Sequence, residues 1–195
     1  SFKEVVSLLK NRYTLNGESH RIVEGVMVTS EFLFRSFLLS QVGYKRLMDT
    51  YYPDECSLAC YAGPFEPAVL SDNKAGTFDL TFICKPQRYL LTGEVPQIFT
   101  ANGSISNPTL FNARPFIRVY GTGALGIGSE SITISQADVY TDIDCELQEV
   151  YKGTTNCNGN ITLTDGKFPV LESGNNEITF IGFSQVELTP NWWTL

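Results

Sequence analysis

The sequence contains one histidine, His20, and it has neither a Cys-x-x-Cys pair nor a Gly-x-Ser-x-Gly motif. Histidine is the usual general base beside a nucleophilic serine or cysteine, and the glycine–serine motif marks the nucleophile of α/β-hydrolases. The sequence therefore lacks the motif and the histidine pattern by which a nucleophilic enzyme is usually recognised. We expect no catalytic residue, and we interpret His20 as a surface or interface residue.

Long apolar runs are also missing. No stretch approaches the roughly 20 apolar residues of a membrane span, and residues 1–13 lack the basic start and small-residue cleavage site of a signal peptide. We therefore expect a soluble chain without a membrane span.

Basic residues are scarce in one half of the chain. Residues 94–195 carry four Lys/Arg against eleven Asp/Glu, whereas residues 1–93 carry ten of each. Nucleic-acid binding needs clustered Lys and Arg, so no nucleic-acid partner is expected. The same asymmetry, together with a Gly-, Pro- and Asn-rich stretch over residues 91–109, predicts one domain over 1–93 and a second over 94–195.

The five cysteines are odd in number: Cys56, Cys60, Cys84, Cys145 and Cys157. Cys56 and Cys60 would be neighbours on a helix, but "CSLACYAG" also reads as a strand, on which they would lie about 13 Å apart. With no histidine near them, a zinc site is not expected. We predict buried thiols, no metal and no cofactor.

The segment "YGTGALGIG" carries Gly121, Gly123 and Gly126 at the G-x-G-x-x-G spacing of dinucleotide-binding folds. That motif works only where a helix follows and directs its N-terminus at the pyrophosphate. Here "GSESITIS" follows, with the alternation of a half-buried strand. We therefore predict a glycine-rich hairpin between antiparallel strands and no nucleotide site.

Two further groups of residues suggest sites. Alternation along "DVYTDIDCE" places four acidic residues on one strand face: Asp138, Asp142, Asp144 and Glu146. Carboxylates of a hydrolase or of a calcium site would form a similar row. A catalytic pair of carboxylates needs contrasting environments, so we interpret this row as a solvated face, with a weak cation site as the alternative.

Trp192 and Trp193 could stack on a sugar. Neighbouring strand residues point to opposite faces, so we predict that both are structural, one of them at an interface.

Apolar periodicity predicts a mainly β chain. In the first half we expect helices over residues 1–12 and 31–43 and strands at "HRIVEGVMVT" and "GTFDLTFICKP", the last ended by Pro86. In the second half six strand-like segments with glycine and asparagine turns predict an antiparallel sandwich. These segments are "PFIRVYG", "SITIS", "VYTDID", "NITLTDG", "NEITFIGF" and "QVELTPNWWTL".

Several strings together resemble the distal tail protein of siphophages, the long non-contractile-tailed bacteriophages. They are "FLLSQVGYKRLMDTYYPDECSLACYAGP", "GTFDLTFICKPQRYL", "NPTLFNARPFIRVYGTG", "DIDCELQEVYKG", "FPVLESGNNEITF" and "VELTPNWW", and they cover residues 31–195. Residues 1–30 depart from the family's pattern, so the resemblance implies a ring domain that is incomplete or divergent at its start.

The resemblance implies an N-terminal β-sandwich with a packed helix that forms a homohexameric ring, and a C-terminal galectin-like β-sandwich. It implies a structural hub of the tail-tip baseplate, located in the virion tail tip after assembly in the bacterial cytoplasm. The implied partners are further copies of the chain, the major tail tube protein, the tail-associated tip protein and receptor-binding proteins. The alternative function is a carbohydrate-binding module for host cell-wall polysaccharide. Residues 106–195 contain no histidine, so the resemblance transfers no sugar site.

Overall fold

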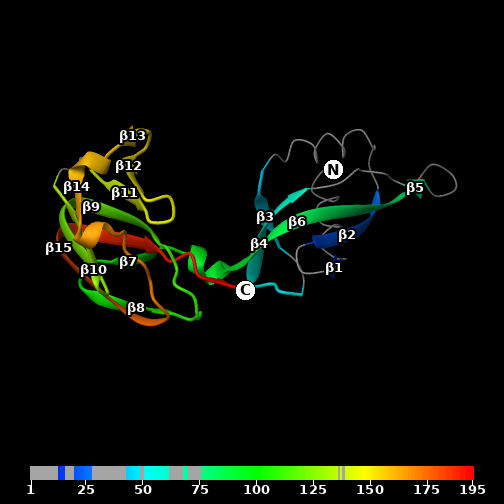
Figure 1. The fold of residues 1–195 in the computed structure, drawn as a ribbon, viewed down its shortest axis with the longest axis horizontal. Helices are drawn as coiled ribbons and strands as arrows, with labels where there is room; N and C mark the ends of the chain where they lie inside the picture. The colour runs from blue at the N-terminus through cyan, green and yellow to red at the C-terminus, as the bar shows by residue number, and fades with distance from the viewer. Residues whose placement is uncertain are drawn as a thin grey trace. The chain divides into compact units, whose positions relative to one another are not determined.

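The structure, a computed structural model, is mainly β, as the sequence predicts (Figure 1). It describes residues 13–15, 20–27, 43–48, 51–61, 68–69, 76–135, 137 and 139–195. The predicted helix over 1–12 lies outside these residues, and of the one predicted over 31–43 only Gly43 is described. Within the described part, no helix has the length and apolar character needed to cross a membrane.

The chain divides into two compact units, one of residues 1–88 with Leu195 and one of residues 89–194. The described strands of the first unit form a sheet in the order β1–β2–β6–β4–β3, and β5 also pairs with β6. Their bounds are β1 Tyr13–Leu15, β2 His20–Met27, β3 Lys45–Leu47, β4 Glu55–Tyr61, β5 Ala68–Val69 and β6 Gly76–Leu90. The two strands predicted in this half are therefore confirmed, and the described residues of "CSLACYAG", which the sequence left open between helix and strand, belong to β4.

The end predicted for the last of these strands is wrong, because β6 runs through Pro86 to Leu90. Proline removes one backbone donor, which matters only where a neighbouring strand needs it. The described pairing of β6 with β2 stops at Ile83, opposite His20. Pro86 thus lies beyond the last described pair of the β2 ladder, so its missing N–H removes no hydrogen bond from the described β2–β6 pairing.

The second unit contains a nine-stranded sheet, with three short 3₁₀ turns besides it. Its strands are β7 Gln97–Phe99, β8 Gly103–Asn107, β9 Phe116–Ile127, β10 Glu130–Ile134, β11 Thr141–Asp144, β12 Glu149–Lys152, β13 Thr155–Asn156, β14 Ile161–Leu163 and β15 Gly174–Thr189, and β16 Trp193–Thr194 follows. The strand pairs described within this sheet are antiparallel, which confirms the predicted arrangement.

Two strands predicted near the C-terminus are in fact one. β15 continues from the "NEITFIGF" segment into "QVELT", and it stays paired with β9 across two register shifts, between Ile181 and Phe183 and between Phe183 and Gln185. A bulge of this kind bends a strand without ending it. The glycine at position 182 was therefore a sign of a bend and not of a turn.

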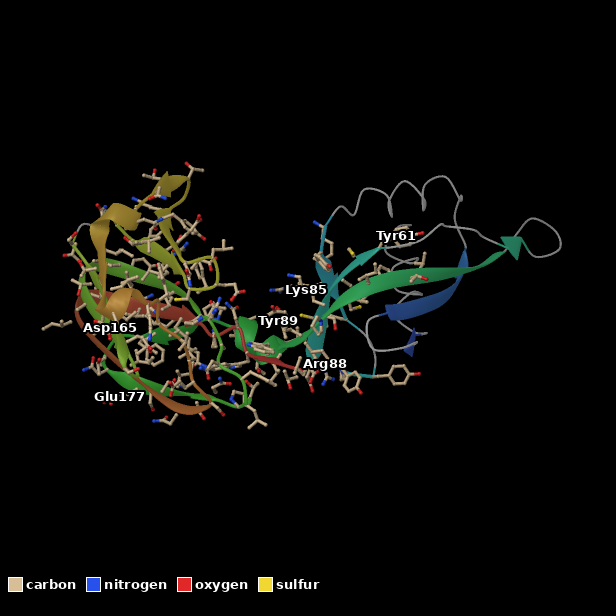
Figure 2. All side chains as sticks on the ribbon, viewed as in Figure 1. Tyr61, Lys85, Arg88, Tyr89, Asp165 and Glu177 are labelled. Atoms are coloured by element: carbon tan, nitrogen blue, oxygen red, sulfur yellow. The ribbon has the colours of Figure 1, made fainter. Side chains whose placement is uncertain are left out.

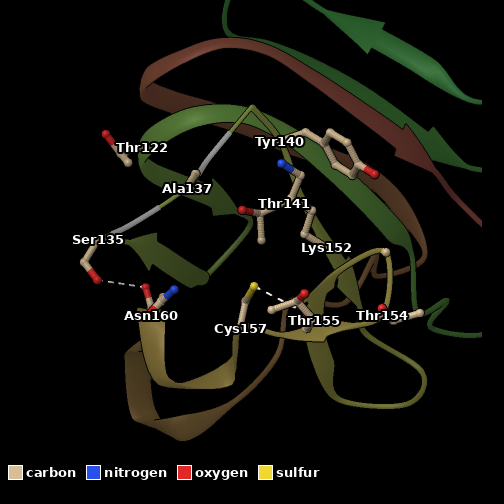
Figure 3. A pocket seen from close by; sticks show the side chains of 11 residues that line it. Thr122, Ser135, Ala137, Tyr140, Thr141, Lys152, Thr154, Thr155, Cys157 and Asn160 are labelled. Carbon is tan, nitrogen blue, oxygen red and sulfur yellow. Dashed lines mark hydrogen bonds between the residues drawn. The ribbon is translucent and has the colours of Figure 1, made fainter.

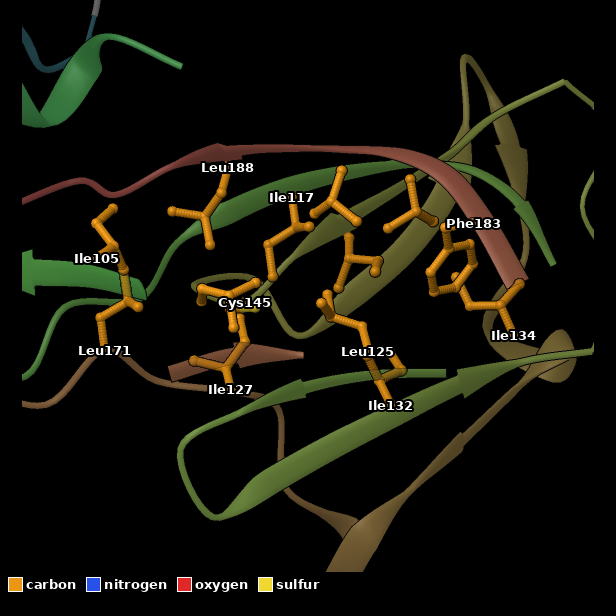
Figure 4. Close-up of a cluster of buried hydrophobic side chains, with 14 of the residues drawn as sticks. Ile105, Ile117, Leu125, Ile127, Ile132, Ile134, Cys145, Leu171, Phe183 and Leu188 are labelled. Carbon is orange, nitrogen blue, oxygen red and sulfur yellow. The ribbon is translucent and has the colours of Figure 1, made fainter. Parts of the chain in front are cut away.

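The core of this unit lies on the inner face of its own sheet. Ile117 and Val119 in the first half of β9, and Leu125 and Ile127 in the second half, are fully buried in one cluster (Figure 4). No helix longer than a 3₁₀ turn is present among the described residues of this unit to cover them. The sheet therefore folds over, so that the two halves of its long strands face the same core, as in a sandwich whose strands change layer at bulges.

Glycines make this bend possible where β9 and β15 cross from one half to the other. A Cβ atom at Gly123 would overlap the carbonyl oxygen of Ile181, and one at Gly182 would overlap that of Thr122. Gly182 also has φ +87°, in the region that favours glycine. The two backbones thus approach more closely than any side chain permits.

We expect Gly123→Ala to lower the free energy of unfolding by about 2–4 kcal/mol, because the added methyl group forces the two strands apart. Gly159→Ala is the control, since a Cβ there meets no atom within 4 Å, and it should change stability by less than about 0.5 kcal/mol. Urea titration followed by tryptophan fluorescence measures both. Equal effects of the two substitutions would contradict this account of the bend.

Candidate functional site

The glycines of the dinucleotide-like motif lie inside a strand. Gly121, Gly123 and Gly126 all belong to β9, which pairs with β15 on one side and with β10 and β11 on the other. The hairpin turn follows them, at Gly128. A strand follows as predicted, but the glycines serve the bend and the close packing of β9 and not the turn itself.

The predicted row of acidic residues is not a single solvated face. Asp142 is buried, Asp144 is half-buried, Glu146 is exposed in the turn after β11, and Asp138 lies outside the described residues. Asp144 accepts hydrogen bonds from the backbone N–H groups of Glu146 and Leu147, at 3.0 and 2.9 Å. Its carboxylate therefore fixes the turn. In the part of the chain that is described, no group of three or more His, Cys, Asp or Glu side chains is placed to hold a metal ion.

Asp142 is buried because Arg118 covers it. The Arg118 Nε and Nη2 atoms donate to the two carboxylate oxygens at 2.6 and 3.0 Å, a bidentate pair across neighbouring strands β9 and β11. The hydrogen bonds to Asp142 raise the pKa of Arg118 above its usual value, so the guanidinium stays charged. The guanidinium also lies over the ring of Tyr140, with 4.3 Å from Cζ to the ring centroid.

The polar row continues onto β15 on the same outer face. Glu187 is the cross-strand neighbour of Arg118, and its Oε1 accepts from the Tyr120 hydroxyl at 2.9 Å and from the Gln185 amide at 2.7 Å. The hydrogen bond to Glu187 is the main reason that the pKa of Tyr120 is raised. The carboxylates of Asp142 and Glu187 thus accept hydrogen bonds from side chains of the same sheet.

A cleft of about 870 Å³ opens on the second unit, between the ends of β10, β11 and β12 and the following turns (Figure 3). Five serine and threonine side chains line it, together with Tyr140: Thr122, Ser135, Thr141, Thr154 and Thr155. Asn160 and Lys152 add an amide and an amine, and the described lining contains no carboxylate or histidine. Both the backbone N–H and the hydroxyl of Ser135 donate to the carbonyl oxygen of Asn160, at 2.9 and 3.0 Å, which fixes one wall.

The remaining predicted residues have structural contacts. Trp192 is buried in the core, and Trp193 stacks on Phe111 with 4.4 Å between ring centroids and donates its indole N–H to the carbonyl oxygen of Asn112. None of the five cysteines, all of them described, forms a disulfide. Burial raises the pKa of the Cys145 thiol to about 12. For His20 only the backbone is described, as the first residue of β2.

Sequence reasoning missed Arg118 and Thr141. The signal for Arg118 was available, because a charged residue between Ile117 and Val119 on an alternating strand must lie on the outer face and find a partner there. Thr141 gave no signal, because a threonine at an inward strand position is an ordinary β-former.

Comparisons with known proteins identify the fold. No family model matches the chain, and no curated protein matches it. Among solved structures, the Dit (gp 19.1) protein of phage SPP1, described as a hub of the adsorption apparatus of phages infecting Gram-positive bacteria, matches with a TM-score of 0.63 and 14% identity, covering 90% of this chain and 79% of that one.

The baseplate of phage P2 in its activated conformation also matches. The structure with Ca has a TM-score of 0.54 and 11% identity, and the one with Sr has 0.55 and 12%; each match covers 91% of this chain and 84% of the other. The chain therefore has the fold of phage hub and baseplate proteins.

The ion pair on the outer face should contribute measurably to stability. Asp142→Ala leaves the Arg118 guanidinium without its bidentate partner, and we expect the free energy of unfolding to fall by about 2 kcal/mol. Glu146→Ala is the matched control, because its contact with Arg114 is exposed and 3.6 Å long, and it should cost less than about 0.5 kcal/mol. Urea titrations measure the free energy of unfolding of both variants. A loss for Asp142→Ala no larger than that for Glu146→Ala would refute the stabilising role of the ion pair.

Burial should make Cys145 unreactive. At about pH 8, a thiol of pKa about 12 is ionised to roughly one part in 10⁴, so iodoacetamide should modify Cys157 in the folded protein and reach Cys145 only in urea. Peptide mapping by mass spectrometry measures the modification of each cysteine, and modification of Cys145 and Cys157 at similar rates would contradict this expectation.

The same shift predicts how stability depends on pH. The folded state retains the Cys145 proton up to about pH 12, whereas the unfolded state loses it from the ordinary pKa of 9.0, so the contribution of Cys145 to the free energy of unfolding falls as the pH rises above 9.0.

Proposed function

We propose that the chain is a structural virion protein, the distal tail protein of a siphophage tail tip. The observation that carries this proposal is the fold likeness to phage hub and baseplate proteins, which extends over about 90% of the chain and includes both units. The sequence strings that resemble the same family are a second, separate support for this proposal. In this role the protein is a hub located in the virion tail tip, after assembly in the bacterial cytoplasm, and it carries out no reaction.

The proposal gives each part of the chain a task. An N-terminal domain over residues 1–93 forms a homohexameric ring that continues the tail tube, and a galectin-like domain over residues 94–195 extends from it. The ring joins the major tail tube protein to the tail-associated tip protein, and receptor-binding proteins attach to the same hub. The acidic character of residues 94–195 suits a domain that stays solvated.

Self-association has a suitable surface on the first unit. Four large side chains there are 42–66% exposed: Tyr44, Met48, Tyr51 and Tyr52. Lys85 and Arg88, both labelled in Figure 2, place their cationic groups 5.0 and 4.9 Å from the ring centroids of Tyr44 and Tyr52. Exposed aromatic and Arg side chains are enriched in protein interfaces and supply much of their binding energy.

A non-enzymatic role agrees with how the acidic residues are used. Asp142 pairs with Arg118, and Asp144 accepts from the backbone of the next turn. A hydrolase needs two carboxylates in contrasting environments across a cleft. If the chain nevertheless hydrolysed a glycoside, Asp142→Asn and Asp144→Asn would reduce the activity, and we expect no activity in either variant or in the parent chain.

The ring can be tested on the full chain. Light scattering after size-exclusion chromatography should give a mass of six chains of 21.7 kDa each, and negative-stain images should show six-fold rings. A strictly monomeric species at every concentration would contradict the hub.

A pair of variants locates the ring interface. Tyr51→Ser should weaken assembly by tenfold or more, since it removes an exposed aromatic side chain from the proposed interface. Leu110→Ser is the control, because Leu110 is 88% exposed but lies on the second unit, and its assembly should be unchanged.

A further inference from the structure

We propose that Asn158 is a site of spontaneous covalent modification, at which the main-chain nitrogen of Gly159 displaces the side-chain amide as ammonia. An asparagine reacts in this way most readily when glycine follows it, because glycine has no side chain to hinder the attack. The described part of the chain contains two such pairs, Asn102–Gly103 and Asn158–Gly159. The inference goes beyond the hub role, which the modification neither requires nor prevents.

The reaction exchanges ammonia for water and involves no oxidation or reduction. The Gly159 nitrogen, after losing its proton to hydroxide, attacks the Cγ atom of Asn158 and forms a five-membered succinimide. The bond from Cγ to the side-chain nitrogen breaks, and that nitrogen takes a proton from water and leaves as ammonia. Water then opens the succinimide to aspartate or to isoaspartate, in which the main chain runs through Cγ. Either product adds one negative charge to the net charge of −7.

The electrophile is activated alike in the two pairs. Oδ1 of Asn102 accepts a hydrogen bond from the backbone N–H of Phe180 at 2.9 Å, and Oδ1 of Asn158 accepts one from that of Val150 at 2.6 Å. This oxygen carries the negative charge when a nucleophile adds to Cγ, and a backbone N–H donor stabilises that charge as in an oxyanion hole. Both asparagines are exposed, so water reaches both. The nucleophile must therefore distinguish them.

In the first pair the nucleophile is held in a strand ladder. Gly103 is the first residue of β8 and pairs with Ile178 of β15. Phe180 directs its N–H to Asn102, on the β8 side, so Ile178 two residues earlier faces the same side. Gly103 and Ile178 are thus an antiparallel pair of the kind that exchanges both backbone hydrogen bonds. The Gly103 nitrogen can react only after this end of the ladder opens.

In the second pair the nucleophile lies in an exposed turn. Gly159 belongs to the 3₁₀ turn Asn158–Asn160, which follows β13 and lies outside the described strands (Figure 1). The backbone hydrogen bond described for this turn runs from Asn160 to the carbonyl oxygen of Cys157, at 2.9 Å, and does not use the Gly159 nitrogen. A Cβ atom at Gly159 would meet nothing within 4 Å, so the backbone has room to rotate towards Cγ of Asn158.

The modification changes the turn that closes the β12–β13 hairpin. Val150 donates its N–H to Oδ1 of Asn158, and its carbonyl oxygen accepts from the N–H of Cys157 at 2.7 Å. Aspartate keeps a side-chain oxygen for Val150. Isoaspartate places that oxygen in the main chain and lengthens the turn, so we expect it to lower the free energy of unfolding more than aspartate does.

The test is ageing of the full chain in warm, mildly alkaline buffer, followed by peptide mapping with mass spectrometry. We expect Asn158 to react roughly tenfold faster than Asn102 in the folded protein, and the two to react at similar rates in urea, where the ladder is lost. Asn160 is the internal control, because Ile161 follows it and hinders the attack, and it should stay unmodified. Equal rates at Asn102 and Asn158 in the folded protein, or no reaction at Asn158 while the unfolded sample reacts, overturns the proposal.

Variants test the assigned nucleophile. Gly159→Ala places a methyl group beside the attacking nitrogen, and we expect it to slow the reaction at Asn158 roughly tenfold while leaving the fold unchanged, since the position is open. Ser129→Ala, in the exposed turn between β9 and β10, is the matched control and should react as the parent does. Asn158→Asp should co-elute with the aspartate product on anion exchange. An unchanged rate in Gly159→Ala overturns the proposal.

Discussion

The second unit depends on the close approach of two backbones, those of β9 and β15, at Gly123 and Gly182. Both strands are long enough to contribute to the two halves of the sheet, and their fully buried residues on either side of the bend share one core. A sheet without covering helices buries an inner face only by folding over itself. The contact between these glycines makes that fold-over possible, and the core, the outer polar row and the cleft all follow from it.

Polar side chains in this unit divide into two groups with different consequences. Those on the outer face, such as Arg118, Asp142 and Glu187, satisfy one another across neighbouring strands and hold the sheet in register. Those in the cleft, such as Ser135, bond to the carbonyl oxygen of a neighbouring turn and fix one wall.

Alternation and turn residues were sufficient to predict most strands and the mainly β class, because those patterns reflect burial on one face. They were insufficient where tertiary contacts decide the outcome. Pro86 does not end β6, which continues to Leu90, past the last described pair of the β2 ladder. Asp142 is buried, since an arginine from a strand 24 residues earlier covers it.

The order in which the strands pair has a consequence for synthesis. β7 and β8 come first in the second unit, yet both pair with β15, as in the register of Phe99 with Val186. β9 likewise keeps one of its edges open until β15 exists. On the ribosome this half of the chain must remain unclosed, with hydrophobic strand edges available to other chains, until nearly all of it has been translated. Cells producing many copies at once would therefore benefit from chaperones that prevent incomplete chains from associating with one another.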